Sequence, residues 1–215
     1  REKQSRIVGL YEEMGIKPTL TCTPYYLEKP RRGWHLAWAE SSATVYANSV
    51  IGAWTNREGG PSALAAAIVG KTPNYGVHQA ENRRANVLIK VGSRLVNETE
   101  FGALGIYAGK LLKDKIPVFE GFPNPTSEGL KQLGAGMASS GMTSMFYFGK
   151  LREKSGLEKV SVNVKDVKNA VEGLSTTHEN PDLVFIGCPH CSLNEVRKVA
   201  QAIEGKKVNK GKELW

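Results

Sequence analysis

Three cysteines supply the most reactive side chains of this 215-residue sequence. Cys188 and Cys191 follow the apolar run LVFIG, and Ser192 and Glu195 have the spacing of a capping box that begins a helix. A thiolate at such a position is stabilised by the helix dipole and by free backbone N–H groups. Ligands of α/β proteins also bind where parallel strands end. We therefore expect thiolate chemistry around residues 187–192.

The Cys-x-x-Cys pair is open to four interpretations. A thioredoxin-like redox pair has this spacing between a strand and a helix, but such domains carry it early, whereas this chain nearly ends after Cys191. A tetrahedral zinc site needs further ligands, and Cys22 is the only other cysteine. An iron–sulfur centre can be built from cysteines that are far apart in the sequence. Inert buried cysteines are the structural alternative.

A second group of polar residues lies between residues 20 and 70. It contains Cys22 in a Cys-Thr-Pro-Tyr turn, the run Glu40-Ser41-Ser42, and an Asn-Arg-Glu-Gly-Gly-Pro loop with Arg57. The loop precedes a helix, so its N–H groups and the Arg57 guanidinium suit a carboxylate or phosphate. The structural alternatives are a turn held by an Arg57–Glu58 pair and simple helix capping by Glu40-Ser41-Ser42.

Two histidines and one tyrosine flank these groups. His190 either hydrogen-bonds a ligand near Cys188 or fills the turn. His35 follows Trp34, and we expect it to serve packing and not a ligand. Tyr25, close to Cys22, is the aromatic residue that we single out as a site neighbour.

The composition limits the partners. The net charge is +8, but the basic residues are scattered without interleaved aromatics, so we expect attraction for small anions and no nucleic-acid binding. The apolar runs are too short to span a bilayer, and no secretory signal is visible, so we expect no membrane partner. An odd number of cysteines then favours a reducing compartment, the cytoplasm. Because the chain opens on Arg1 inside a helical pattern, we expect it to be a fragment.

Hydrophobic periodicity and turn residues predict the elements that must position these groups. The expected helices cover residues 1–14, 41–51, 61–70, 78–84, 99–112, 127–140, 164–174 and 192–203, with Ser41 or Ser42 as a cap, and the expected strands cover residues 16–22, 36–40, 85–91, 116–119, 143–148 and 183–187. The alternation after residue 85 predicts α/β layers with parallel strands. The glycines of the 99–112 helix predict close helix–sheet contact.

The same pattern divides the chain into three parts. We expect a site-bearing segment of helices and loops at residues 1–84, packed on the sheet domains. An α/β domain at residues 85–150 and an α/β segment at residues 151–215, which carries the Gly-Cys-Pro-His motif, would follow, with a soft seam around residues 151–162.

Five sequence blocks stand in a recognisable order. They are Cys22-Thr23-Pro24-Tyr25, Glu40-Ser41-Ser42-Ala43, Tyr46-Ala47-Asn48-Ser49, the TNREGGPS run at residues 55–62, and Gly187-Cys188-Pro189-His190. Together they resemble the large subunit of the aconitase X family, and its archaeal branch in particular, over essentially the whole chain. The resemblance implies aconitase-like layered domains with mostly parallel sheets flanked by helices. It also implies a hydro-lyase in which an iron–sulfur cluster, [4Fe–4S] in type, acts as a Lewis acid.

The resemblance assigns roles to several residues. Cys22 matches the first and Cys188 the second of three cluster-binding cysteines, and the third lies beyond the C-terminal end of this chain. Cys191 departs from the usual family residue, either as a neutral variation or as a substitute ligand. Glu40 and Ser41, with Ser42 beside them, match a block that contacts substrate. The catalytic base stays unassigned.

The resemblance further implies dehydration of (R)-5-phosphomevalonate to trans-anhydromevalonate 5-phosphate in isoprenoid synthesis, with a separate small subunit as partner. A related branch of the family implies dehydration of cis-3-hydroxy-L-proline, and a truncated, non-catalytic α/β binding domain is the alternative from another class. Because parts of the family's site lie outside this chain, we expect the isolated fragment to be inactive. All of these expectations require the sulfurs of Cys22 and Cys188 to face one cavity at neighbouring strand ends.

Overall fold

The structure, a computed structural model, describes residues 1–92, 94–122, 124–150, 156–177 and 179–215. Within this part, four parallel strands form a sheet in the order β3-β2-β1-β4, with β1 at Val87–Val91, β2 at Pro117–Glu120, β3 at Tyr147–Phe148 and β4 at Glu158–Val162. In the register of the central strands, Ile89 lies opposite Phe119 on one side and Val160 on the other. The predicted α/β class with parallel strands is confirmed.

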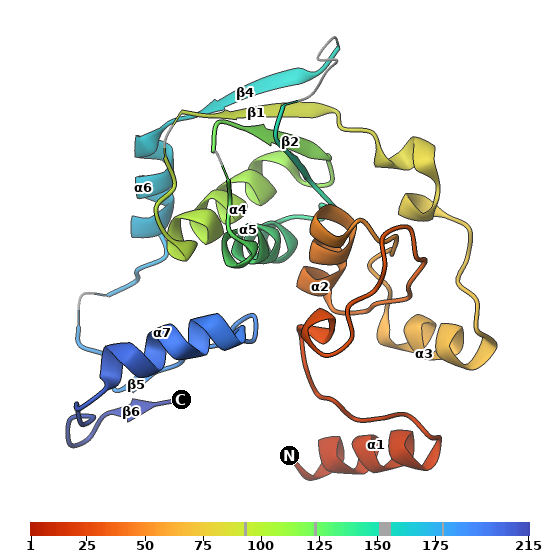
Figure 1. The fold of residues 1–215 in the computed structure, drawn as a ribbon, viewed down its shortest axis with the longest axis horizontal. Helices are drawn as coiled ribbons and strands as arrows, with labels where there is room; N and C mark the ends of the chain where they lie inside the picture. The colour runs from red at the N-terminus through yellow and green to blue at the C-terminus, as the bar shows by residue number, and fades with distance from the viewer. Residues whose placement is uncertain (93, 123, 151–155, 178) are drawn as a thin grey trace.

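Three helices cover one face of this sheet (Figure 1). They are α4 at Glu98–Leu112, α5 at Ser127–Ser140 and α6 at Val164–Glu172. Each begins with a side-chain cap, because Asn97, Thr126 and Asn163 accept hydrogen bonds from N–H groups of the first turn. The main core lies between the helices and the sheet, and its fully buried members include Val87, Ile89, Leu104, Phe119, Leu133, Met137 and Phe146.

Glycines bring α4 and α5 into close contact. A Cβ on Gly105 would meet the Leu133 carbonyl, and a Cβ on Gly136 would lie 2.8 Å from the Ile106 nitrogen. The prediction that the α4 glycines face the sheet is therefore wrong. They face α5 instead, and the spacing along one helix does not say which neighbour fills the glycine face.

The N-terminal segment is built from short helices and loops. Its elements are α1 (Glu2–Glu13), η1 (Pro24–Tyr26), α2 (Ser41–Tyr46) with its π-helical continuation η2 (Ala47–Ile51), α3 (Gly60–Val69), η3 (Gly76–His78) and η4 (Ala80–Arg83). The strands predicted at residues 16–22 and 36–40 are wrong. These residues form no strand, and Leu20 has a φ of 44°, outside the extended region. The nearest pairing is a single bridge between His35 and Trp54.

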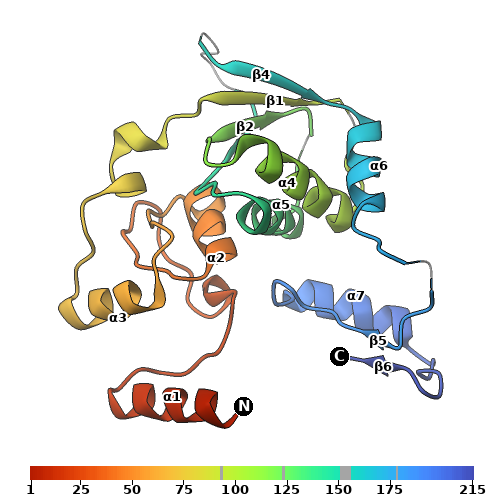
Figure 2. The same ribbon diagram turned by 180° about the vertical axis from the view of Figure 1, so that it is seen from behind.

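The C-terminal segment lies beyond α4 and α5 on the side away from the sheet, as does α1 (Figures 1 and 2). It consists of β5 (Leu183–Val184), α7 (Leu193–Ile203) and β6 (Glu213–Leu214), and β5 pairs with β6. The buried strand predicted at residues 183–187 is wrong, because it is short and its two residues are each 44% exposed. The capping box at the start of α7 is confirmed.

The predicted division of the chain is crossed by the sheet. β4 pairs with β1, so the α/β unit continues beyond residue 150 to Val162. Residues 151–155 of the predicted seam lie outside the described residues, and the three-part division stays a prediction. In the described part of the chain, every helix is too short or too polar to cross a membrane.

Candidate functional site

Cys22 and Cys188 lie on the wall of one cavity of about 260 Å³. The other lining residues come from the start of α2, from α4 and α5, and from the loop before α7, and they are Glu40, Ser41, Ser42, Gly102, Ile106, Gln132, Ala135, Gly136, Ser139 and Pro189. The prediction of a common cavity is confirmed. Its placement at neighbouring strand ends is wrong, because no strand precedes Cys22 and β5 belongs to a separate strand pair.

Hydrogen bonds join the two cysteine segments at His190. Its N–H donates to the Sγ of Cys22 at 3.1 Å, and its ring Nδ1 lies 3.2 Å from the Oγ1 of Thr21. The same Thr21 hydroxyl accepts from the Thr23 N–H at 3.0 Å, which closes the turn around Cys22. The turn that follows Cys188 is thus fixed directly to the turn that holds Cys22.

The donor set suits an iron–sulfur cluster. All three cysteines are free thiols, and Cys22 already accepts an N–H hydrogen bond of the kind that thiolate ligands receive. Among the described residues, no three His, Cys, Asp or Glu side chains converge as a metal site, so Cys22 and Cys188 would supply two ligands of a larger set. Their role as ligands stays a prediction.

Cys191 lies half-buried beyond the turn. Burial and the neighbouring Glu195 carboxylate raise the pKa of its thiol, and the Lys131 ammonium opposes them. It is absent from the lining of the cavity that Cys22 and Cys188 share. Its use as a substitute ligand also stays a prediction.

The run Glu40-Ser41-Ser42 reaches the cavity as the first residues of α2. The Oε2 of Glu40 accepts from the Ala43 N–H at 2.5 Å and from the Ser42 hydroxyl at 2.7 Å. The prediction that Ser41 or Ser42 caps this helix is therefore wrong, because Glu40 is the cap. The structure brings all three residues to the wall beside the cysteines. Their contact with substrate stays a prediction.

Arg57 lies elsewhere. Its Nη1 donates to the Gly141 carbonyl and its Nη2 to the Ala138 carbonyl, each at 3.1 Å, so the guanidinium closes the C-terminal end of α5. Glu58 accepts instead from Ser62 and Thr72. The residues that line the cysteine cavity do not include Arg57, whose role in substrate binding stays a prediction.

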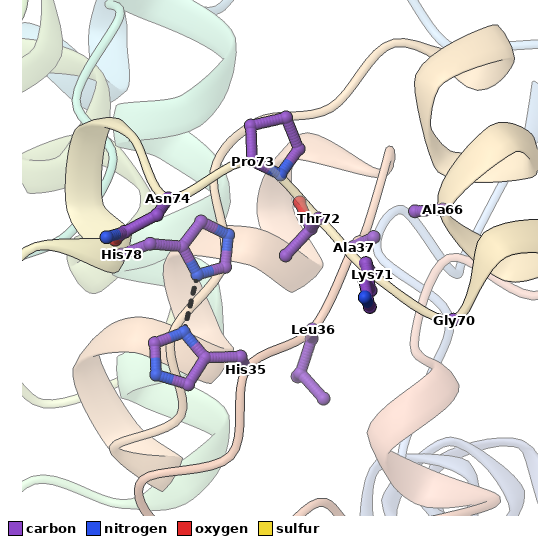
Figure 3. Close-up of a pocket in the computed structure, with 10 residues that line it drawn as sticks. All are labelled: His35, Leu36, Ala37, Ala66, Gly70, Lys71, Thr72, Pro73, Asn74 and His78. Atoms are coloured by element: carbon purple, nitrogen blue, oxygen red, sulfur yellow. Dashed lines mark hydrogen bonds between the residues drawn. The ribbon is translucent and has the colours of Figure 1, made fainter.

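Two histidines line a second cavity of about 510 Å³ (Figure 3). The Nδ1 atoms of His35 and His78 lie 2.8 Å apart, so one ring donates to the other. His78 is 5% exposed, and its Nε2 has no hydrogen-bond partner among the described residues. Burial lowers the pKa of His78, and His35 lowers it further. His35 packs on the Trp54 ring, as expected, although the residue itself is exposed. Nothing in the sequence indicates the pairing with His78.

Tyr25 and Lys131 are two further buried polar residues close to the cysteine turns. Tyr25 stacks on Tyr46 with 4.2 Å between ring centroids, and burial raises the pKa of its hydroxyl, which has no partner among the described residues. Lys131 donates to the His190 carbonyl at 3.1 Å and pairs with Glu195. Nothing in the sequence pattern singles out Lys131, because lysine on an amphipathic helix is ordinarily solvated.

Comparison with known proteins gives a consistent result. Sequence models of the Aconitase X first, second and third domains match residues 1–81, 85–172 and 181–215. The phosphomevalonate dehydratase large subunit of Methanocaldococcus jannaschii is 46% identical over 100% of this chain and 57% of its own length. A cis-3-hydroxy-L-proline dehydratase from Hypocrea jecorina is 30% identical over 95% of this chain and 38% of its own length.

A solved structure extends the likeness to three dimensions. The crystal structure of Thermococcus kodakaraensis aconitase X in its holo-form superposes with a TM-score of 0.88 at 42% identity, covering 94% of this chain and 54% of that one. The chain spans about half the length of the archaeal relatives that it matches. Three consecutive domain matches together with this fold agreement show that the chain belongs to the aconitase X family.

Proposed function

We propose that this chain is part of the large subunit of a hydro-lyase that dehydrates (R)-5-phosphomevalonate to trans-anhydromevalonate 5-phosphate. Cys22 and Cys188 supply two thiolate ligands of an iron–sulfur cluster of the [4Fe–4S] type, and the third ligand comes from outside this chain. A separate small subunit completes the enzyme, and the cytoplasm is its expected compartment. The single observation that carries the proposal is the cavity shared by the two sulfurs and Glu40.

The chain's own residues suit this role chemically. Thiolates are the soft ligands that iron–sulfur clusters require, and the His190 N–H is already placed on one of them. When bound, an iron with an open coordination position polarises the C–O bond of a substrate hydroxyl and makes hydroxide a better leaving group. Glu40 and the two serines offer a carboxylate and two hydroxyls to orient the substrate on the same wall.

The phosphorylated substrate is supported by two further observations. The archaeal relatives that match at 46% identity carry the phosphomevalonate dehydratase name, whereas the two cis-3-hydroxy-L-proline dehydratases match at 30% and 31%. The net charge of +8 also favours a multiply anionic ligand. Dehydration of cis-3-hydroxy-L-proline is the second candidate, since proteins of that name match over nearly the whole chain.

The test uses the full-length large subunit with its small subunit. After anaerobic reconstitution, iron and sulfide content are measured, and water loss is followed on (R)-5-phosphomevalonate and on cis-3-hydroxy-L-proline. We expect a cluster and turnover of the phosphorylated substrate. A complex with no cluster and no turnover would leave only a binding domain, and turnover of the proline substrate alone would establish the second candidate.

Cysteine variants sharpen this test. Cys22→Ser and Cys188→Ser are expected to lose the cluster, because each removes a thiolate from the shared cavity. Cys191→Ser is the matched variant, since Cys191 lies outside the lining of that cavity, and it is expected to keep the wild-type iron content. Loss of iron in Cys191→Ser with retention in Cys22→Ser would overturn the ligand assignment.

A further inference from the structure

Lys131 is the most deeply buried cation among the described residues that contact the cysteine turns. Its side chain is 1% exposed, on α5, and an ammonium group at such a depth is costly unless it is paired and hydrogen-bonded. It meets this need at two points. Nζ donates to the carbonyl oxygen of His190 at 3.1 Å and pairs with the Glu195 carboxylate.

Both partners of Lys131 belong to the segment that carries Cys188. The Oε2 of Glu195 also accepts from the Ser192 N–H at 2.7 Å, as the capping box of α7. One turn earlier on α5, Glu128 accepts from the Ser192 hydroxyl at 3.1 Å. α5 therefore fixes the end of the 188–192 loop through two adjacent turns.

His190 connects this anchor to the other cysteine. Its carbonyl accepts from Lys131, while its N–H donates to the Sγ of Cys22 at 3.1 Å. The two groups belong to neighbouring peptide units, so a shift of one moves the other. α5 also lines the cysteine cavity through Gln132 and Gly136. The same helix therefore positions part of the cavity wall and, through Lys131, the peptide that carries the N–H donor.

We propose that Lys131 is a positioning residue of the cysteine site: its buried ammonium group holds the His190 carbonyl and thereby keeps the His190 N–H on the sulfur of Cys22. The expected effect on an iron–sulfur cluster rests on the proposed function. The contacts of His190 with Lys131 and Cys22 do not depend on it. N–H donation to a ligand sulfur withdraws electron density and tunes both metal affinity and reduction potential.

The test compares Lys131→Met with Lys115→Met in the full-length large subunit and its small subunit. Lys115 pairs with Glu158 at the surface, far from the cysteines in sequence, and serves as the matched lysine. If Lys131→Met does not fold, the double variant Lys131→Met/Glu195→Leu removes both charges, since replacing a buried pair by apolar side chains is often tolerated.

Three readouts separate positioning from mere stability. In the metal-free protein, alkylation of Cys22 at pH 7 is followed by peptide mass analysis, and we expect a several-fold slower rate in Lys131→Met, because the reactive thiolate loses the N–H donor that stabilises it. In the reconstituted complex, iron affinity measured by chelator competition should fall roughly tenfold or more, as changes of ligand-supporting groups typically do, and the midpoint potential should become more negative. Lys115→Met should match wild type in all three.

The outcomes distinguish the two proposals. Wild-type Cys22 alkylation together with wild-type iron affinity and potential in a folded Lys131 variant would overturn the inference. A wild-type complex that holds no cluster would overturn the proposed function. In that case the Cys22 alkylation rate alone still decides whether Lys131 positions the His190 N–H.

Discussion

The cysteine cavity and the histidine cavity are built in different ways. The floor of the cysteine cavity depends on the close approach of α4 and α5, where the backbone at Gly136 touches the backbone around Gly105. The histidine cavity depends on side-chain hydrogen bonds between loops, beginning with the pair His35 and His78. Substitutions that add volume should therefore destabilise the protein most at the cysteine cavity. At the histidine cavity, loss of a charge and a change of pH should have the larger effect on stability.

Arg83 shows how far the histidine side relies on hydrogen bonds. The side chain is 7% exposed and donates to the carbonyls of Val77, Asn48 and Ala53 and to the Oδ1 of Asn48. Its guanidinium also lies over the Trp54 ring, which in turn packs on His35. One cation thus joins the loops that the histidines belong to. On the cysteine side, by contrast, packed helices hold the cavity wall.

The largest expected effect is at the helix contact. In Gly136→Ala, the new Cβ would lie 2.8 Å from the Ile106 nitrogen and 3.0 Å from the Gly105 carbonyl carbon, and backbone on both sides has little room to move. We expect the free energy of unfolding to fall by about 2–3 kcal/mol, as overpacking does in close-packed interiors, measured by urea denaturation.

The matched control is Gly60→Ala at the start of α3, the helix whose other end lines the histidine cavity. A Cβ there has no atom within 4 Å. The free energy of unfolding should change by no more than about 0.5 kcal/mol, the usual range for substitutions at surface positions. Equal losses in the two variants would refute the claim that volume matters more on the cysteine side.

The next effect is at Arg83. Arg83→Met would leave buried carbonyl oxygens without donors, and each unsatisfied buried group costs about 1–3 kcal/mol. Because the variant also removes a desolvated charge, we expect a net loss of about 2 kcal/mol in the free energy of unfolding. Arg83→Lys should restore only part of it, since one ammonium cannot reproduce the fork of guanidinium donors. Full recovery in Arg83→Lys would show that charge alone is needed there.

A smaller, pH-dependent effect is expected at His78. Its folded-state pKa is lowered by burial and by His35 and Arg83, with Glu58 opposing, while the unfolded value is about 6.5. As pH falls below about 6.5, the unfolded chain binds the proton first, so wild type loses stability. The difference in Tm between wild type and His78→Gln should therefore narrow from pH 7.5 to pH 5.5. For Gly60→Ala we expect the difference in Tm from wild type to stay constant over this pH range. A constant difference for His78→Gln as well would contradict this account.

The parts of the fold that the sequence predicts well are those with strong local signals. The helices α4, α5 and α7 have apolar periodicity, cap residues or glycine stops, and their observed bounds agree with the predicted ranges within a few residues. β1 contains the apolar run Val87–Ile89, which is typical of a buried parallel strand, and only Lys90 in this strand is exposed. In these cases the local pattern and the tertiary packing demand the same structure.

The errors arise where distant contacts decide. The apolar residues at 183–187 resemble a buried strand, but the observed pairing with β6 leaves them at the surface. The contact of His190 with both Cys22 and Lys131 joins segments that are remote in the sequence. Motif order could identify the two cysteines as a pair, but the lysine that supports them has no motif, because its contacts with His190, Glu195 and the Tyr26 ring come from segments remote in the sequence.

Glu40→Gln has the smallest expected effect on stability and tests whether Glu40 does more than cap α2. The amide keeps an oxygen that can accept from the Ala43 N–H, so the free energy of unfolding should change by less than about 1 kcal/mol, the usual size of a cap contribution. The negative charge on the cavity wall beside Cys22 and Cys188 is lost, however.

If the carboxylate orients substrate as proposed, the full-length complex carrying Glu40→Gln should lose about tenfold or more in kcat/KM, the equivalent of one charge-assisted hydrogen bond of roughly 1.5–3 kcal/mol. Iron content and Tm should stay at wild-type values, which separates this loss from damage to the cluster or the fold. An unchanged kcat/KM would mean that Glu40 serves only the helix. Orientation of substrate on this wall would then depend on Ser41 and Ser42 and on groups outside this chain.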